Sequence, residues 1–89
     1  NVNEVGGYLA SKLDEMVEKY DYIKGHRGVG LLHGLECNGP VGEIINKALE
    51  KGLLLINAGT NVIRFIPPLV ITKENVDEMI EILEKSLSL

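Results

Sequence analysis

The sequence lacks the features typical of nucleic-acid-binding, membrane and disulfide-stapled proteins. Its one cysteine, Cys37, cannot form an internal disulfide, which favours a reducing compartment, and we expect a cytoplasmic protein. Aromatic residues make up 4% of the chain, and the net charge is −4 without a basic cluster, so no nucleic-acid partner is expected. No apolar run approaches the length of a membrane span, so no membrane partner is expected either.

Residue patterns that would indicate catalysis are also missing. The candidate nucleophiles have no histidine and acid placed to activate them. They are Ser11, Ser86, Ser88 and Cys37. The lysines fall on helix faces, helix ends or loops, whereas a lysine that forms a Schiff base needs a desolvated position. Neither histidine has a second histidine or cysteine at ligand spacing, so no metal site is expected. The chain is therefore expected to contain no catalytic residue of its own.

What is present is a regular alternation of apolar patterns over 89 residues, enough for one domain spanning residues 1–89. Helical periodicity predicts helices near residues 5–20, 40–51 and 73–87, the last with Thr72 as its N-cap. Period-two runs predict strands at 27–37, 53–56 and 62–66, with residues 57–61 as the hairpin turn between the last two. The expected fold is α+β, in the order α-β-α-β-β-α, with a small, largely antiparallel three-stranded sheet and helices on one face.

The run 27–37 alternates so regularly that it predicts one strand with two different faces. Gly28, Gly30 and Gly34 would share one face, where their missing side chains would let another backbone or helix approach. We expect this glycine face to pack against a partner that is absent from the sequence. A phosphate-binding loop is not expected, because the glycines miss the dinucleotide spacing and lie within a strand. His33, on the apolar face, is interpreted as a hydrogen-bonded core histidine, and His26 is expected to be solvated.

Arg64 is the one charge inside the strand at 62–66, just before the strand-ending pair Pro67-Pro68. Arginine is suited to binding a carboxylate, because it offers two parallel N–H donors and a permanent charge. From the strand alone two alternatives stay open. Arg64 could pair with a structural carboxylate, or it could lie along the edge of the sheet.

Two motifs together resemble the C-terminal segment of the class III pyridoxal-phosphate aminotransferases. The first runs Arg27-Gly28-x-Gly30-Leu31-Leu32-x-Gly34-Leu35-Glu36. The second runs Asn61-Val62-Ile63-Arg64-Phe65-x-Pro67-Pro68-Leu69 and is followed by Thr72-x-Glu74. Within this family the chain is most similar to the acetylornithine aminotransferases, and the similarity covers nearly all of it.

The resemblance implies a small C-terminal domain packed on a missing large domain that binds pyridoxal 5'-phosphate, in an enzyme that is a homodimer. It implies transfer of an amino group from N-acetylornithine to 2-oxoglutarate, in arginine biosynthesis, with Arg64 holding the substrate α-carboxylate. The family's cofactor lysine and phosphate contacts match no residue here, so this segment alone is expected to be inactive and to bind no cofactor. Arg27 also matches the motif and is interpreted as structural, at the entry of its strand.

Other functional hypotheses remain open beside that of an acetylornithine aminotransferase. The donor could instead be ornithine, succinylornithine or γ-aminobutyrate, as in other class III aminotransferases. The chain could also be a stand-alone domain that binds a small anion or amino acid through Arg64. A docking domain is the third alternative, with the glycine face buried and Arg64 in a salt bridge.

Overall fold

The computed structural model describes residues 2–30, 32–66 and 71–87, which form three helices and four strands. In chain order these elements are α1 (Val2–Lys19), β1 (Ile23–Val29), β2 (Leu32–Cys37), α2 (Gly42–Glu50), β3 (Leu55–Asn57), β4 (Val62–Phe65) and α3 (Lys73–Leu87). Residue 31 and the segment 67–70 lie outside the described residues, so the expected end of β4 at Pro67-Pro68 is not addressed by the structure.

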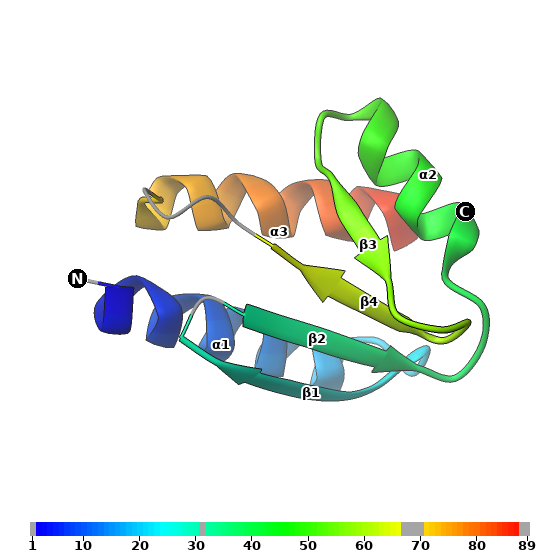
Figure 1. Ribbon diagram of the computed structural model, residues 1–89, viewed down its shortest axis with the longest axis horizontal. Helices are drawn as coiled ribbons and strands as arrows, with labels where there is room; N and C mark the ends of the chain where they lie inside the picture. The colour runs from blue at the N-terminus through cyan, green and yellow to red at the C-terminus, as the bar shows by residue number, and fades with distance from the viewer. Residues whose placement is uncertain (1, 31, 67–70, 88–89) are drawn as a thin grey trace.

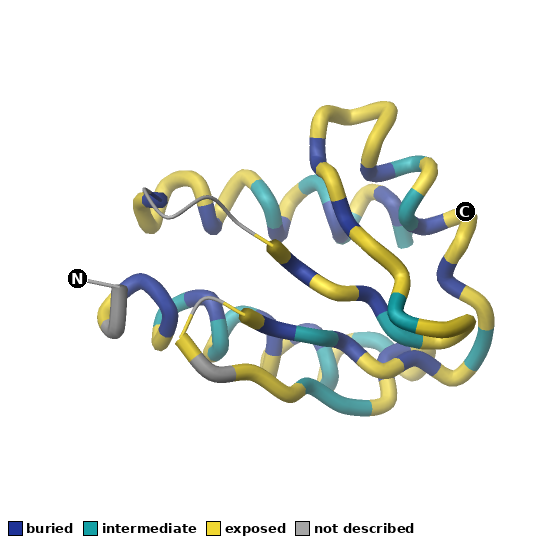
Figure 2. Tube along the Cα trace, viewed as in Figure 1, coloured by how far each residue is buried: buried dark blue, intermediate teal, exposed yellow. Residues whose placement is uncertain are grey.

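The four strands form one antiparallel sheet in the order β1-β2-β4-β3, and the helices pack on one of its faces (Figure 1). Along β2 and β4 the residues alternate between buried and more exposed, as Figure 2 shows. Leu35, Ile63 and Phe65 point to the helices and are fully buried, whereas Arg64 between them is exposed. The expected α+β class, antiparallel pairing and one-sided helical layer are confirmed.

The expected number of strands was wrong, because the run 27–37 is a hairpin rather than one strand. The sequence pattern predicted three strands in the order α-β-α-β-β-α, but the chain reverses between Val29 and Leu32, which pair with each other. Gly30 has a φ of 61°, in the left-handed region that glycine adopts at low cost, so it starts a tight turn. The pattern hid this turn because apolar residues continue on both sides of it.

The hairpin also changes which glycines share a face. Residues opposite each other in an antiparallel pair lie on the same side of the sheet, so the alternation shifts phase across a two-residue turn. Gly28 pairs with His33 and lies on the helix side, whereas Gly34 pairs with Arg27 and lies on the open side. The prediction that three glycines share one face is therefore wrong. Gly28 and Gly34 lie on opposite faces, and Gly30 lies in the turn.

The core lies between the sheet and the apolar stripes of the helices. Helix α1 contributes Val5, Leu9, Leu13 and Met16, and α3 contributes Val76, Ile80 and Leu83. None of the described helices is long and apolar enough to cross a membrane.

The ends of two helices match the sequence prediction. The backbone N–H of Asn75 donates to Thr72 Oγ1 (3.1 Å), and Asn75 Oδ1 accepts from the backbone N–H of Thr72 (3.0 Å). Asparagine thus completes the reciprocal cap usually made by glutamate or glutamine. Gly52, with a φ of 92°, follows the end of α2 as expected.

Candidate functional site

Arg64 occupies the middle of a row of residues that crosses the open face of the sheet. The register pairs Arg27 with Gly34, Gly34 with Arg64, and Arg64 with Ile56, so all four side-chain positions lie on the same face. Gly34 lies on β2, between the strands that carry the two arginines. Because it has no side chain, no side chain separates Arg27 from Arg64 in this row. The fold therefore brings together two cationic residues that are far apart in the sequence.

This row lines a shallow depression of about 290 Å³ on the open face. Its lining residues are Arg27, Gly34, Glu36, Ala58, Val62 and Arg64. Gly34 is not required here by packing, since a Cβ at this position would meet only ordinary contacts, the nearest being 3.6 Å from the Ile63 carbonyl oxygen. The small residues Gly34 and Ala58 keep the space beside Arg64 open.

The electrostatic balance of the depression is positive. Glu36 is its one lining carboxylate, and it lies 3.9 Å from Lys24 Nζ. Within residues 2–30, 32–66 and 71–87, neither Arg27 nor Arg64 forms an ion pair. Arg64 also has β2 on one side and β3 on the other, so it is not on a sheet edge. In the described part of the chain, both structural alternatives for Arg64 are therefore unsupported.

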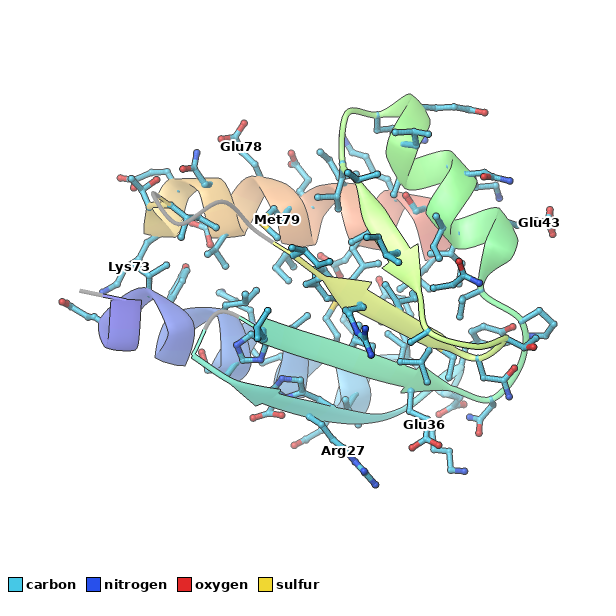
Figure 3. All side chains as sticks on the ribbon, viewed as in Figure 1. Arg27, Glu36, Glu43, Lys73, Glu78 and Met79 are labelled. Atoms are coloured by element: carbon cyan, nitrogen blue, oxygen red, sulfur yellow. The ribbon has the colours of Figure 1, made fainter. Side chains whose placement is uncertain are left out.

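The placement of Arg27 was missed by sequence reasoning. It is the fifth residue of β1 rather than the strand entry, and it shares the open face with Arg64. Figure 3 shows Arg27 and Glu36 extending on the same side of the hairpin, away from α3. Gly30 was the one local signal in the sequence, because a glycine can begin the tight turn that fixes the register of β1 against β2.

Arg64, the one residue predicted to bind substrate, thus lies exposed beside an open space. The side chain of Cys37, in contrast, is buried, and burial raises the pKa of its thiol to about 11. The thiol therefore stays protonated at neutral pH, a state that makes it a poor nucleophile.

The two histidines lie on the other face of the hairpin, against α1. His33 is 4% exposed and hydrogen-bonded through both ring nitrogens, which confirms its interpretation as a core histidine. The expected solvation of His26 was wrong: 8% of its side chain is exposed, and it contacts Asp14 and His33. The reason is the phase shift at the turn, which places His26 and His33 on the same face. No group of metal ligands forms among the described residues.

An α+β domain with one face of its sheet open and an exposed arginine in the middle of that face suggests one part of a larger binding protein. Comparison with known proteins identifies the class: the chain belongs to the class-III aminotransferase family, whose model matches residues 1–87.

Individual relatives support this assignment. The chain is 49% identical over 87 residues to an acetylornithine aminotransferase of Clostridium acetobutylicum, covering 98% of this chain and 22% of that protein. It is 42% identical over 84 residues to an acetylornithine aminotransferase of Methanocaldococcus jannaschii, covering 94% and 21%. The chain thus spans about a fifth of the length of the curated relatives it matches.

Solved structures agree with the fold. A lysine aminotransferase from M. tuberculosis in the internal aldimine form matches with a TM-score of 0.91 and 25% identity, over 97% of this chain and 20% of that one. An acetylornithine aminotransferase from Elizabethkingia anophelis matches with a TM-score of 0.87 and 32% identity, over 97% and 23%. An ornithine aminotransferase from Plasmodium yoelii matches with a TM-score of 0.88 and 34% identity, over 97% and 24%.

Proposed function

We propose that this chain is the C-terminal substrate-binding domain of a pyridoxal-phosphate-dependent acetylornithine aminotransferase, and that Arg64 binds the α-carboxylate of the substrate. The reaction would convert N-acetylornithine and 2-oxoglutarate to N-acetylglutamate semialdehyde and glutamate. The observation that carries the proposal is the position of Arg64, exposed beside an open depression and without an ion pair in the described part of the chain. The names of the relatives supply the substrate class.

The chemistry of the site suits a carboxylate. A guanidinium presents two parallel N–H donors that match the two oxygens of a carboxylate, and its charge persists at every accessible pH. Hydrogen bonds to a charged group contribute roughly 1.5–3 kcal/mol. The space left by Gly34 and Ala58 gives such a ligand access to the arginine. Because both substrates carry an α-carboxylate, one arginine would serve both half-reactions.

The described residues do not by themselves fit the cofactor. A lysine that carries pyridoxal 5'-phosphate covalently needs a shielded amine, whereas each lysine of this chain is exposed or half-buried at the surface. We therefore assign the cofactor contacts to the remaining four-fifths of the polypeptide, and we expect residues 1–89 alone to be inactive. The role of this segment is to bind and orient the substrate.

The open face of the sheet is suited to contact with that remaining part. Leu32, Ile56 and Ile66 are 65%, 42% and 52% exposed, on or beside the face that carries Arg64. Exposed apolar residues gathered around a polar site are typical of surfaces covered by another domain. We propose that the large cofactor-binding domain covers this face, in an enzyme that is a homodimer located in the cytoplasm.

The identity of the amino donor is the part of the proposal for which there is a specific alternative. Solved structures of an ornithine aminotransferase and a lysine aminotransferase match this fold about as closely as the solved structure of an acetylornithine aminotransferase does. The α-carboxylate contact through Arg64 would be common to these donors, as it would be to succinylornithine. Steady-state assays of the full-length protein with each donor would decide between them.

The proposal is tested by replacing Arg64 with lysine in the full-length protein. Lysine keeps the charge but loses the paired donors, so we expect kcat/KM to fall at least about tenfold in single-turnover assays of both half-reactions. Arg27→Lys is the matched control, since it makes the same change two strands away, and we expect it to lose less than about threefold. Unchanged rates for Arg64→Lys in both half-reactions would remove Arg64 from the substrate site. Purified residues 1–89 that bound an amino acid without the rest of the enzyme would favour a stand-alone binding domain.

A further inference from the structure

Four groups from different parts of the fold form a continuous line of contacts on the helix side of the hairpin. Asp14 Oδ1 on α1 lies 2.7 Å from His26 Nδ1 on β1. His26 Nε2 lies 2.8 Å from His33 Nδ1 on β2, and His33 Nε2 lies 2.8 Å from the carbonyl oxygen of Gly30 in the turn. All three distances are those of hydrogen bonds. The line therefore connects α1, both strands of the hairpin and the turn between them.

Two glycines make the space in which this line fits. A Cβ on Gly28 would lie 1.9 Å from His33 Nδ1, so the imidazole of His33 occupies the position that any other side chain would fill. A Cβ on Gly6 of α1 would lie 2.4 Å from the Gly30 carbonyl oxygen, so α1 lies too close to the turn to carry a side chain at this position. The arrangement thus depends on residues of three elements.

The number of protons in the line follows from its two ends. A carboxylate oxygen and a backbone carbonyl oxygen both accept hydrogen bonds, so the outer ring nitrogens, His26 Nδ1 and His33 Nε2, must both donate. The central contact between the two rings needs one more proton. Three N–H protons are therefore required, but two neutral imidazoles carry only two. We propose that Asp14, His26, His33 and the Gly30 carbonyl form a partly buried proton-binding site that holds one proton more than two neutral histidines and links α1 to the hairpin.

The position of the extra proton can be assigned from the surroundings. Burial lowers the pKa of His33, which favours its neutral form with the proton on Nε2, toward Gly30. The extra proton then belongs to His26, whose Nδ1–H donates to Asp14 and whose Nε2–H donates to His33. The groups whose charges act on His33 are His26 and Asp14, and β4 places the apolar Phe65 opposite it. The Asp14 carboxylate, with 67% of its side chain exposed, balances the positive charge.

Loss of this proton would break one of the three hydrogen bonds. With only two N–H groups left, one contact brings two acceptors together, either nitrogen and carboxylate, nitrogen and nitrogen, or nitrogen and carbonyl oxygen. The link is therefore complete at low pH and incomplete after the proton leaves as the pH rises. The attachment of α1 to the hairpin would therefore weaken as the pH rises and the extra proton leaves.

The test uses Asp14→Asn in the full-length protein, with Glu15→Gln as the matched control on the same helix. Asparagine keeps an oxygen that can accept from His26 Nδ1, but it removes the charge that balances the extra proton. Opening of the hairpin is measured by hydrogen exchange of peptides within residues 23–37, each variant against the unmodified protein at the same pH. We expect Asp14→Asn to raise the opening equilibrium constant about tenfold at about pH 5.5 and less than about threefold at about pH 8.5. Glu15→Gln should show no such pH dependence.

A second measurement reads the protons directly, on protein labelled with nitrogen-15 in its histidines. At about pH 5.5 the proposal requires His33 to be the neutral Nε2–H tautomer and His26 to be doubly protonated. Single His26→Gln and His33→Gln variants assign the signals. Finding His33 as the Nδ1–H tautomer, or an effect of Asp14→Asn that is equal at both pH values, would overturn the proposal.

Discussion

Gly28→Ala is expected to be among the most damaging single-methyl additions in the hairpin. The added Cβ would lie 1.9 Å from His33 Nδ1 and 2.6 Å from both Cγ and Cε1 of the same ring. To reach an ordinary separation of about 3.5 Å, the imidazole would have to move by roughly 1.5 Å. A movement of that size takes both ring nitrogens out of hydrogen-bonding range of their partners, which now lie at 2.8 Å.

The cost follows from what that movement leaves unpaired. The His33 ring is buried, so its nitrogens and the Gly30 carbonyl would lose their partners without gaining water. Each buried polar group left unsatisfied costs about 1–3 kcal/mol, and we expect a total destabilisation of about 2–4 kcal/mol. Gly34→Ala is the matched control on the other face of the hairpin. Its Cβ would have ordinary contacts and its φ is not positive, so we expect stability to be unchanged or higher by about 0.5–1 kcal/mol.

The measurement is hydrogen exchange of the β1 and β2 amides in the full-length protein, supported by its thermal unfolding midpoint. A double variant, Gly28→Ala with His33→Ala, separates the steric cause from a backbone effect. Removing the ring removes the clash, so the double variant should be more stable than the sum of the two single changes implies. If Gly28→Ala were as harmless as Gly34→Ala, the placement of the His33 ring against Gly28 would be wrong.

Two further predictions concern α3. Thr72→Ala removes the acceptor of the Asn75 N–H and should lower the unfolding free energy by about 1 kcal/mol, whereas Thr72→Ser should keep this hydrogen bond. The thermal unfolding midpoints of the two variants are compared, and equal midpoints would contradict the role of Thr72 as the N-cap. Hydrogen bonds from Lys19 and, more weakly, Tyr20 to Glu84 lower the pKa of Glu84. The stability that this ionised carboxylate contributes is therefore fully present above the pKa of an unfolded glutamate. It is lost as the pH falls through the lower pKa of the folded state. The stability difference between the unmodified protein and Glu84→Gln should therefore shrink on acidification, and a difference that grew in acid urea titrations would refute this.

Elements with their own local signal were predictable from the sequence. The stripe from Val5 to Met16 fixes the buried face of α1, because its spacing matches one side of a helix. Thr72 and Gly52 mark helix ends by capping chemistry and by tolerance of positive φ, both of which act within a few residues. The fold class followed because each apolar face needed a partner and these patterns left few arrangements.

The hairpin could not be predicted in the same way, since its turn has little effect on the apolar pattern. Alternation reports that side chains point to opposite faces, but it does not report where the chain reverses. The consequence reached the site itself. With one straight strand, Arg27 could not be placed beside Arg64 and His26 could not be placed beside His33. Both arrangements depend on cross-strand register, which is a property of two strands together.

The same phase shift explains how one short hairpin serves two different purposes. On the helix side, the missing side chain of Gly28 admits the His33 ring and brings it to His26, so the absence of a Cβ is used for packing. On the open side, the missing side chain of Gly34 leaves space beside Arg64 that no described residue fills. Adding a methyl group should therefore affect different properties of the protein at the two glycines. At Gly28 the damage should appear in stability, whereas at Gly34 it should appear in substrate binding, if Arg64 holds the substrate as proposed.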